Sequence, residues 1–329
     1  MKAKRQCAAQ PFFLLALSRS GSTLLQRMLA THPEITTSTE PWLLLPLMDM
    51  LQHTGCTFSA YGHELAIRAI GEFAEARLGG MQRVWEAART FALTLYAEAA
   101  GEGARYFLDK TPAYALICRQ LMRLFPEARF VWLVRQPLAV VASLVETFAD
   151  GKWYLYRRHH ELYWGLAELC ACFLEHRERM IRIRYEDLLL HPEREMQRAF
   201  AYLELDGSKA DWRRFTRVDL GGAMQDPTGV RRYRSLSREP LEKWRHAFTN
   251  PFRKAWARRY LRWIGQERLA LMGYELDALL EELDAIPQRM HGVLSDAARH
   301  IYGWWRVRTQ ADAAALVRQL PPERRSALH

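Results

Sequence analysis

Short, continuous apolar runs alternate with helical patterns along most of this chain. The runs occupy residues 12–17, 106–108, 130–134 and 180–183, and helical or polar segments separate them. Runs of this length are typical of strands that are buried on both faces. Their alternation with helices predicts an α/β fold of three layers (α/β/α), in which helices cover both faces of a central parallel sheet.

Helical patterns also occur outside this alternation. Residues 64–100 are rich in Ala, Leu and Glu and predict helical insertions, while residues 153–178 predict one long helix that carries aromatic side chains. From residue 276 onward the pattern is helical only. We therefore expect a main α/β domain at residues 1–275 and a C-terminal helical extension at residues 276–329.

The extension has one apolar helical face. It is formed by Leu294, Ala298, Ile301 and Trp305, with Arg308 beside them. We expect this face to dock on the main domain, because an amphipathic helix normally buries its apolar side. A homodimer contact and a cover over an acceptor cleft are the alternatives.

The balance of charges favours a small anionic ligand. The 329 residues include 47 Lys and Arg against 37 Asp and Glu, a net charge of +10, and the excess comes from Arg scattered over helical stretches. The sequence has neither a zinc-finger spacing nor the aromatic signature of RNA-recognition motifs. Nucleic acid is therefore not expected as a partner.

Membrane and disulfide signals are weak. No run reaches about 18 uncharged apolar residues, so no membrane-spanning segment is expected. The five cysteines form no CxxC pair and cannot all pair within the chain, which favours a reducing compartment. We therefore expect a cytoplasmic protein.

A loop containing glycine joins the first apolar run to a helical pattern. Residues 18–23 read SRSGST, and such a strand–loop–helix unit aims backbone N–H groups and the helix dipole at one point, where an anion binds. The unit is P-loop-like. Against the Walker pattern GxxxxGK[ST], Gly21 and Thr23 are in register, but Ala16 replaces the first glycine and Ser22 the lysine. The missing lysine disfavours an ATP-dependent small-molecule kinase, the alternative enzyme class.

A second cation follows the third apolar run. Arg135 comes directly after residues 130–134, and Ser143 lies eight residues later on a predicted helix. A guanidinium at a strand end is a bidentate partner for phosphate, and a nearby hydroxyl adds another donor. The pair predicts a second phosphate subsite beside the loop.

Together these motifs resemble those of sulfotransferases that use 3′-phosphoadenosine-5′-phosphosulfate (PAPS) as the donor. The likeness covers the 5′-phosphosulfate loop, the 3′-phosphate motif and a third strand-end segment, and it spans roughly residues 11–275. The matching segments are RSGSTLL (19–25), HPE (32–34), EP (40–41), FVWLVRQP (130–137) and RYEDL (184–188).

The resemblance implies a catalytic set and a donor site without an obligatory metal. Glu40 matches the general base of protein-tyrosine and some bacterial members, while Lys110 and Arg19 would stabilise the leaving group. Pro112 stands where small-molecule members carry a catalytic His, which favours Glu40 as the base. A late loop at residues 229–237 resembles the segment that closes over the nucleotide. The donor-binding residues implied are Arg19, Ser20, Gly21, Ser22, Thr23, Leu24, Arg135, Ser143, Arg231, Arg232 and Tyr233.

The expected acceptor is a small molecule with a hydroxyl group, aromatic or lipid-like. Aromatic side chains are frequent in the segments expected near it, although core packing is the alternative for each. They are Trp42, Trp153, Tyr154, Tyr156, Tyr163 and Trp164.

Two alternatives to this catalytic scheme are open. His32 is expected to be structural, and His53, His159 and His160 are the alternatives to Glu40 as the base. A non-catalytic nucleotide-binding protein would be favoured if Glu40 and Lys110 lay far from the phosphate loop.

Overall fold

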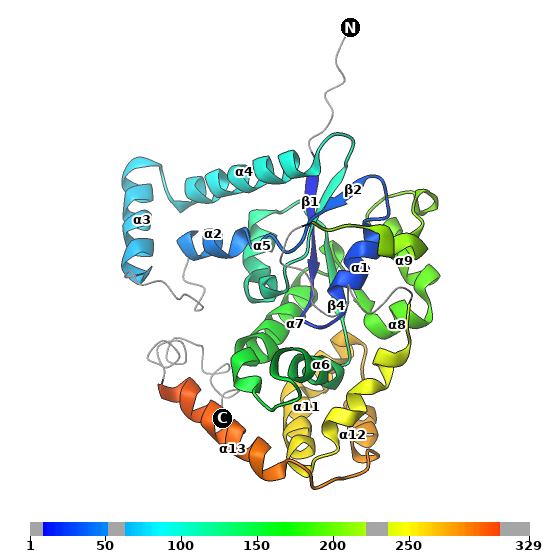
Figure 1. Ribbon diagram of the computed structural model, residues 1–329. Helices are drawn as coiled ribbons and strands as arrows, with labels where there is room; N and C mark the ends of the chain where they lie inside the picture. Colours follow the sequence, from blue (N-terminus) through cyan, green and yellow to red (C-terminus); the bar gives the residue numbers. More distant parts are fainter. Residues whose placement is uncertain (1–8, 52–62, 222–235, 310–329) are drawn as a thin grey trace.

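The computed structural model describes residues 9–51, 63–221 and 236–309 (Figure 1). A five-stranded sheet lies at its centre, and every neighbouring pair of strands is parallel. The strand order is β2-β3-β1-β4-β5. The strands are β1 (Gln10–Leu15), β2 (Ile35–Thr37), β3 (Tyr106–Asp109), β4 (Phe130–Val134) and β5 (Met180–Arg184).

All four apolar runs are strands, and their parallel arrangement confirms the predicted sheet. The first strand ends at Leu15, two residues earlier than its run. Strand β2 was not predicted, because its three residues include only one apolar side chain, Ile35, and two threonines. A segment this short carries no periodic signal.

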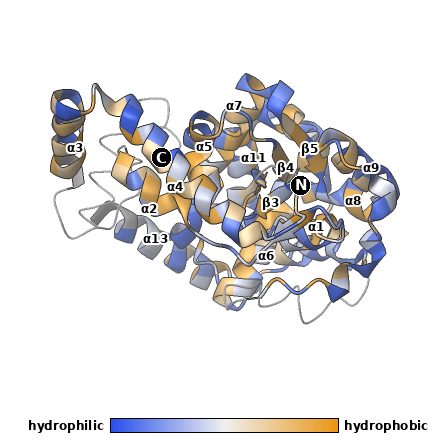
Figure 2. Cartoon of the chain, turned by 90° about the horizontal axis from the view of Figure 1, so that it is seen from above, coloured by the Kyte–Doolittle hydropathy of each residue, from blue (hydrophilic) through white to orange (hydrophobic). Residues whose placement is uncertain are grey.

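Two apolar clusters cover the two faces of the sheet, so the predicted three layers are confirmed. Alternate residues of β1 divide between them: Phe12 and Leu14 face the smaller cluster, while Phe13 and Leu15 face the larger one. In Figure 1, α1 (Ser22–Leu29), α8 (Tyr185–Leu190) and α9 (Pro192–Tyr202) of the smaller cluster lie to the right of β1, whereas α5 (Cys118–Leu124) and α7 (Leu166–Glu175) of the larger cluster lie to its left. Figure 2 shows helices with apolar and polar residues interleaved. The central strand is thus buried on both sides.

The predicted helical insertion is confirmed as two helices, α3 and α4. The helices that surround the sheet and extend from it are α1 (Ser22–Leu29), α2 (Leu44–Leu51), α3 (His63–Arg77), α4 (Met81–Ala100), α5 (Cys118–Leu124), α6 (Pro137–Ala149), α7 (Leu166–Glu175), α8 (Tyr185–Leu190), α9 (Pro192–Tyr202), α11 (Pro251–Met272), α12 (Leu276–Asp284) and α13 (Val293–Thr309).

The single long helix predicted at residues 153–178 is wrong. A 3₁₀ turn (Leu155–Arg158) and a π-helical turn (His160–Gly165) precede α7. Aromatic side chains at helical spacing do not distinguish a 3.6-residue turn from a wider one. The π turn ends at Gly165, where a Cβ atom would lie 3.3 Å from that of Ala115 and 3.6 Å from the Leu17 side chain. This close packing joins the π turn to the end of β1.

The C-terminal helices α12 and α13 both pack on α11, but α13 does so through a different face from the one predicted. Leu294 and Ile301 are 86% and 65% exposed. The buried face contains Asp296, which pairs with Arg253 of α11 (2.7 Å), and Gly303, which packs against Tyr156. A charged pair and a glycine contact therefore orient α13, and neither is visible in a hydropathy pattern.

No helix in the described ranges has both the length and the apolar character needed to cross a membrane.

Replacing Asp296 with Ala should detach α13. The Asp296 side chain is buried and accepts hydrogen bonds from Arg253 Nε (2.7 Å) and Asn250 Nδ2 (3.2 Å). Removing one partner of a buried pair typically costs about 3–5 kcal/mol. The free energy of unfolding, measured in urea, should therefore fall by about 3 kcal/mol.

Glu86→Ala is the control for this variant, because it breaks an exposed pair with Arg83. It should change the free energy of unfolding by less than about 0.5 kcal/mol. Equal effects of the two substitutions would show that the Asp296 contact does not anchor α13.

Candidate active site

The chain between β1 and α1 forms a tight turn at the carboxyl edge of the sheet. The amide of Ser20 donates a hydrogen bond to the carbonyl of Leu17 (3.2 Å), and Arg19 and Gly21 have φ angles of 69° and 91°. Helix α1 begins directly after Gly21, at Ser22. Its first amides and the positive end of its dipole meet at this turn, which suits an anion.

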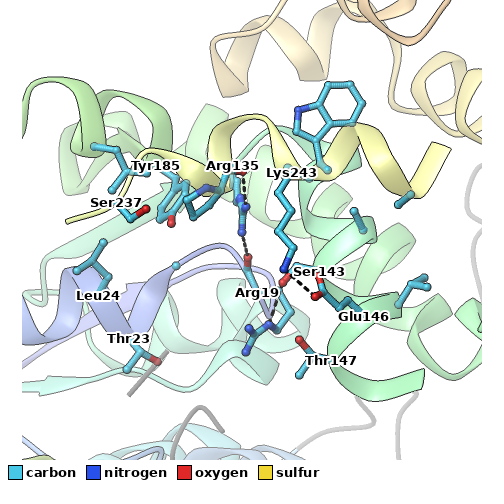
Figure 3. Close-up of a pocket in the computed structure, with 18 of the residues that line it drawn as sticks. Arg19, Thr23, Leu24, Arg135, Ser143, Glu146, Thr147, Tyr185, Ser237 and Lys243 are labelled. Carbon is cyan, nitrogen blue, oxygen red and sulfur yellow. Dashed lines mark hydrogen bonds and ion pairs between the residues drawn. The ribbon is translucent and has the colours of Figure 1, made fainter. Parts of the chain in front are cut away.

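Arg135 holds this turn from the neighbouring strand β4. Its Nη1 donates to the carbonyl of Arg19 (2.8 Å), its Nη2 donates to the carbonyl of Pro240 (3.2 Å), and its guanidinium lies 4.6 Å from the Tyr185 ring centre. Arg19 Nε in turn donates to Ser143 Oγ (3.2 Å) (Figure 3). The two predicted phosphate motifs therefore meet in space, with Ser143 accepting a hydrogen bond from Arg19.

A cavity of about 630 Å³ opens beside this cluster. Six predicted donor-binding residues line it, whereas the side chains of Ser20 and Ser22 are buried and do not. Arg231, Arg232 and Tyr233 lie outside the described residues. The six are Arg19, Gly21, Thr23, Leu24, Arg135 and Ser143.

Two buried guanidinium groups of this cavity suit an anionic or strongly accepting ligand. Arg135 and Arg27 are each 9% exposed, and neither Nε atom has a hydrogen-bond partner within the described ranges. A buried donor without a partner is unfavourable, and a phosphate oxygen would satisfy one while neutralising its charge. The cavity thus fits a phosphate-bearing ligand. Arg27 was not among the predicted residues.

Glu40 and Lys110 form an ion pair at the same edge of the sheet. Lys110 Nζ lies 2.7 Å from Glu40 Oε1, and their side chains are 4% and 19% exposed. The indole of Trp42 donates to the second oxygen of Glu40 (3.2 Å). Lys110 directly follows β3, the neighbour of β1, so the pair lies on the opposite side of the phosphate loop from Arg135. It does not line the cavity.

Glu161 lies against the start of the phosphate loop, and sequence reasoning missed it. Its carboxylate accepts a hydrogen bond from the amide of Ser18, and Arg158 lies 3.9 Å from it. Burial raises the pKa of Glu161, and the negative charge of Glu40 contributes. Glu161 reaches Ser18 from the π turn, an irregularity that is frequent at functional sites. No motif in the sequence marks it.

A buried carboxylate network supports Lys110. Asp109 accepts hydrogen bonds from the hydroxyls of Tyr96 (2.7 Å), Thr111 (3.0 Å) and Tyr114 (3.1 Å). The Tyr114 hydroxyl also accepts a hydrogen bond from the amide of Leu44, at the start of α2 (3.0 Å). The network therefore fixes both Lys110 and the chain that leads from Glu40 into α2.

Glu186 supports Arg135 in a similar way, which gives the third matching segment a structural role. One of its carboxylate oxygens accepts a hydrogen bond from the amide of Gln136 (3.0 Å), and the other accepts one from the hydroxyl of Tyr274 (2.6 Å). Gln136 itself caps α6 by accepting the amide of Ala139 (2.6 Å). The turn after β4 is thereby held in one conformation.

The remaining candidates divide between core and surface. His32 is buried and structural, because its ring bonds the carbonyl of Asp206 (3.1 Å) and the amide of Glu34 (3.1 Å). Trp153 is buried in the core, whereas Trp42 is 42% exposed beside Glu40. His53 lies outside the described residues.

Comparison with known proteins identifies the family. The model of the "Sulfotransferase family" matches residues 11–209, more than half of the chain. The chain belongs to the sulfotransferase family. Membership makes it a transferase of sulfuryl groups and removes the main support for the kinase alternative.

Relatives agree with this assignment, and a solved structure shares the fold. The sulfotransferase is 29% identical over 327 residues to nodulation protein NoeE of Sinorhizobium fredii (strain NBRC 101917 / NGR234). This alignment covers 90% of this chain and 73% of that protein. It is 30% identical over 202 residues to protein-tyrosine sulfotransferase 2 of Gallus gallus, or 60% of this chain and 51% of that protein. The chain therefore spans about half the length of the latter relative. The sulfotransferase domain from the curacin biosynthetic pathway shares the fold, with a TM-score of 0.50, 20% identity, and coverage of 81% of this chain and 98% of that domain.

The Asp109 network predicts a specific dependence of stability on pH. Burial outweighs the three hydroxyl donors and raises the pKa of Asp109 to about 6, above its ordinary value of 3.8. The folded state then binds this proton more tightly than the unfolded state. The Asp109 contribution to the free energy of unfolding should therefore fall as pH rises from about 4 to 6, by at most about 3 kcal/mol.

Urea unfolding of the wild type and of Asp109→Asn at pH 4, 5, 6 and 7 checks this. Asn keeps the shape of the side chain but does not titrate. The wild type should lose stability relative to the variant across this window, and the difference should level off by pH 7. A difference independent of pH would mean that Asp109 does not titrate in this range.

Proposed function

We propose that this sulfotransferase takes the sulfuryl group from PAPS and transfers it to a hydroxyl of a small-molecule acceptor, with Glu40 as the general base. The observation that carries the proposal is the meeting of two cations from separate strands, Arg19 and Arg135, at one cavity. A donor with a phosphosulfate at one end and a 3′-phosphate at the other needs two such anion subsites.

The chain offers separate groups for each end of the donor. The amides at residues 21–23 and the Arg19 side chain would hold the 5′-phosphosulfate, and Arg135 with Ser143 would hold the 3′-phosphate. The Nε of Arg135 has no hydrogen-bond partner in the part of the chain that the structure describes, which supports this arrangement. Cationic groups on both sides also lower the free energy of the charge that develops on the leaving phosphate.

The proposed transfer is an in-line displacement at sulfur. The acceptor oxygen forms a bond to sulfur, the bond from sulfur to the phosphate oxygen breaks, and its electron pair stays with the phosphate. Glu40 takes the acceptor's proton, while Lys110 and Arg19 stabilise the leaving oxygen. Because Lys110 is paired with Glu40 at 2.7 Å, we expect Lys110 to turn toward the donor anion and free the carboxylate for the proton.

An aromatic or lipid-like acceptor is supported by the surroundings of Glu40. The Trp42 ring is 42% exposed and is hydrogen-bonded to this carboxylate, so an apolar acceptor could lie against it with its hydroxyl near the base. The protein-tyrosine sulfotransferases among the relatives are named for a phenolic acceptor. We further propose a cytoplasmic location; a homodimer stays a prediction from the sequence.

Calorimetric titration tests the donor site. Adenosine 3′,5′-bisphosphate, the expected product of the donor, should bind tightly, and ATP with magnesium weakly. Arg135→Ala should lower the affinity for the bisphosphate at least about 30-fold, because a buried charged partner of phosphate is lost. Arg83→Ala, at an exposed position, should have no effect. A preference for magnesium-ATP would contradict the proposal.

Glu40→Gln tests the base. The variant should bind adenosine 3′,5′-bisphosphate as the wild type does, while the turnover number for transfer from PAPS should fall about 10²- to 10⁴-fold. Transfer to 4-nitrophenol and to dodecanol, followed by release of the bisphosphate, provides the assay. Glu193→Gln, which removes an exposed carboxylate, is the matched control. Unchanged turnover in Glu40→Gln would exclude Glu40 as the base.

A further inference from the structure

Arg27 is a buried cation of the cavity that the proposed transfer does not use. It lies in the last turn of α1, one turn after Leu24, and both residues line the cavity. Residues three positions apart share a helix face, so Arg27 extends the lining of the phosphate loop away from the loop itself. Its side chain is 9% exposed, and its Nε has no hydrogen-bond partner among the described residues.

A purely structural role for Arg27 explains its position in the helix but not its place in the cavity wall. A cation in the last turn of a helix interacts favourably with the helix dipole. That interaction does not require the side chain to line a cavity, and it leaves the buried Nε–H donor unsatisfied. A buried donor without a partner typically costs about 1–3 kcal/mol, so a ligand acceptor at this position would recover free energy.

The surroundings of Arg27 are suited to a ring rather than to another phosphate. Leu24 packs against the apolar cluster that covers this face of the sheet, and other residues of that cluster also line the cavity. Figure 3 shows Leu24 near Tyr185 and Ser237, on the opposite side of Arg19 from Glu146 and Thr147. The apolar lining residues at this end are Leu24, Tyr185, Leu189, Phe215 and Leu236.

The cavity thus divides into an anion part and an apolar part. Arg19, Arg135 and Ser143 form the anion part, with the Arg135 guanidinium over the ring of Tyr185. Arg27 lies on α1 with Leu24 of the apolar part, and it is as buried as Arg135. A purine is a flat apolar ring with hydrogen-bond acceptors at its edge, which matches apolar walls and a single fixed donor. A second phosphate would have to lose its hydration among these apolar side chains.

We propose that Arg27 is a base-binding residue, whose guanidinium donates a hydrogen bond to a ring nitrogen of the purine of the donor nucleotide. The inference rests on the proposed function, because it requires a nucleotide in this cavity. It adds a specificity-determining residue for the base to the residues that hold the two phosphates.

Calorimetry with two nucleotides separates base binding from phosphate binding. Arg27→Met removes the donor while keeping an unbranched apolar side chain. It should lower the affinities for adenosine 3′,5′-bisphosphate and adenosine 5′-monophosphate by the same factor, about tenfold, since both nucleotides contain the base. Arg135→Ala is the contrasting variant. Because it removes the proposed partner of the 3′-phosphate, it should weaken binding of the bisphosphate by a larger factor than binding of the monophosphate. Thermal unfolding of each variant reports whether it is folded.

A second measurement uses the intact protein. Analogues of the bisphosphate in which N1, N3 or N7 of adenine is replaced by CH should include one that binds the wild type about tenfold more weakly. That same analogue should bind Arg27→Met no more weakly than the parent nucleotide. The comparison of the analogues with the wild-type protein tests the inference even if Arg27→Met does not fold.

The outcomes distinguish the inference from the proposed function. If the wild type binds the bisphosphate and Arg27→Met binds both nucleotides with wild-type affinity, Arg27 only stabilises the helix and the inference is wrong. A loss confined to the bisphosphate would assign Arg27 to the 3′-phosphate and also overturn it. Equal binding of all three analogues by the wild type would do the same. Failure of the wild type to bind the bisphosphate would overturn the proposed function together with the inference.

Discussion

The left-handed backbone of Arg19 is the constraint on which the site depends. A residue with a side chain in this conformation costs about 1–2 kcal/mol, and its φ of 69° is therefore maintained by contacts elsewhere. Arg135 bonds its carbonyl and Ser143 accepts its Nε–H. Two residues later Gly21 also has a positive φ, and a Cβ atom there would lie 2.3 Å from the Tyr185 ring. The loop therefore needs residues that follow β4 and β5, so the anion site exists only in the assembled sheet.

The strand order separates the tasks of this site into two halves. On the β3 side of the loop lies the Glu40–Lys110 pair, and on the β4 side lies Arg135. A carboxylate that accepts several hydrogen bonds stabilises each half: Asp109 on the β3 side and Glu186 on the β4 side. Such networks orient the functional side chains before a ligand arrives, which limits the reorganisation that binding requires.

The parts of this arrangement that are local in sequence could be predicted, and those that depend on packing could not. The buried strands and the residues at their ends, such as Arg19 and Arg135, follow from apolar runs and from the charges that interrupt them. Strand β2 is too short for a pattern. Glu161 reaches the loop only because a π turn lies against the end of β1, and no spacing rule describes that contact.

The same distinction explains the two expectations that were wrong. The long helix at residues 153–178 and the docking face of α13 were both inferred from the positions of apolar residues alone. In α13 the buried Asp296 and Gly303 decide the orientation, because an ion pair with Arg253 and close contact with Tyr156 outweigh the apolar face. The role of Arg27 is likewise hidden in the sequence, where it is one of many scattered arginines.

A crystal structure of the complex with adenosine 3′,5′-bisphosphate tests the central claim most directly. The account predicts the 5′-phosphate on the amides of residues 21–23 and the 3′-phosphate within hydrogen-bond distance of Arg135, while Arg135 keeps its bond to the Arg19 carbonyl. A nucleotide bound elsewhere, or one whose phosphates contact neither the loop nor Arg135, would contradict it.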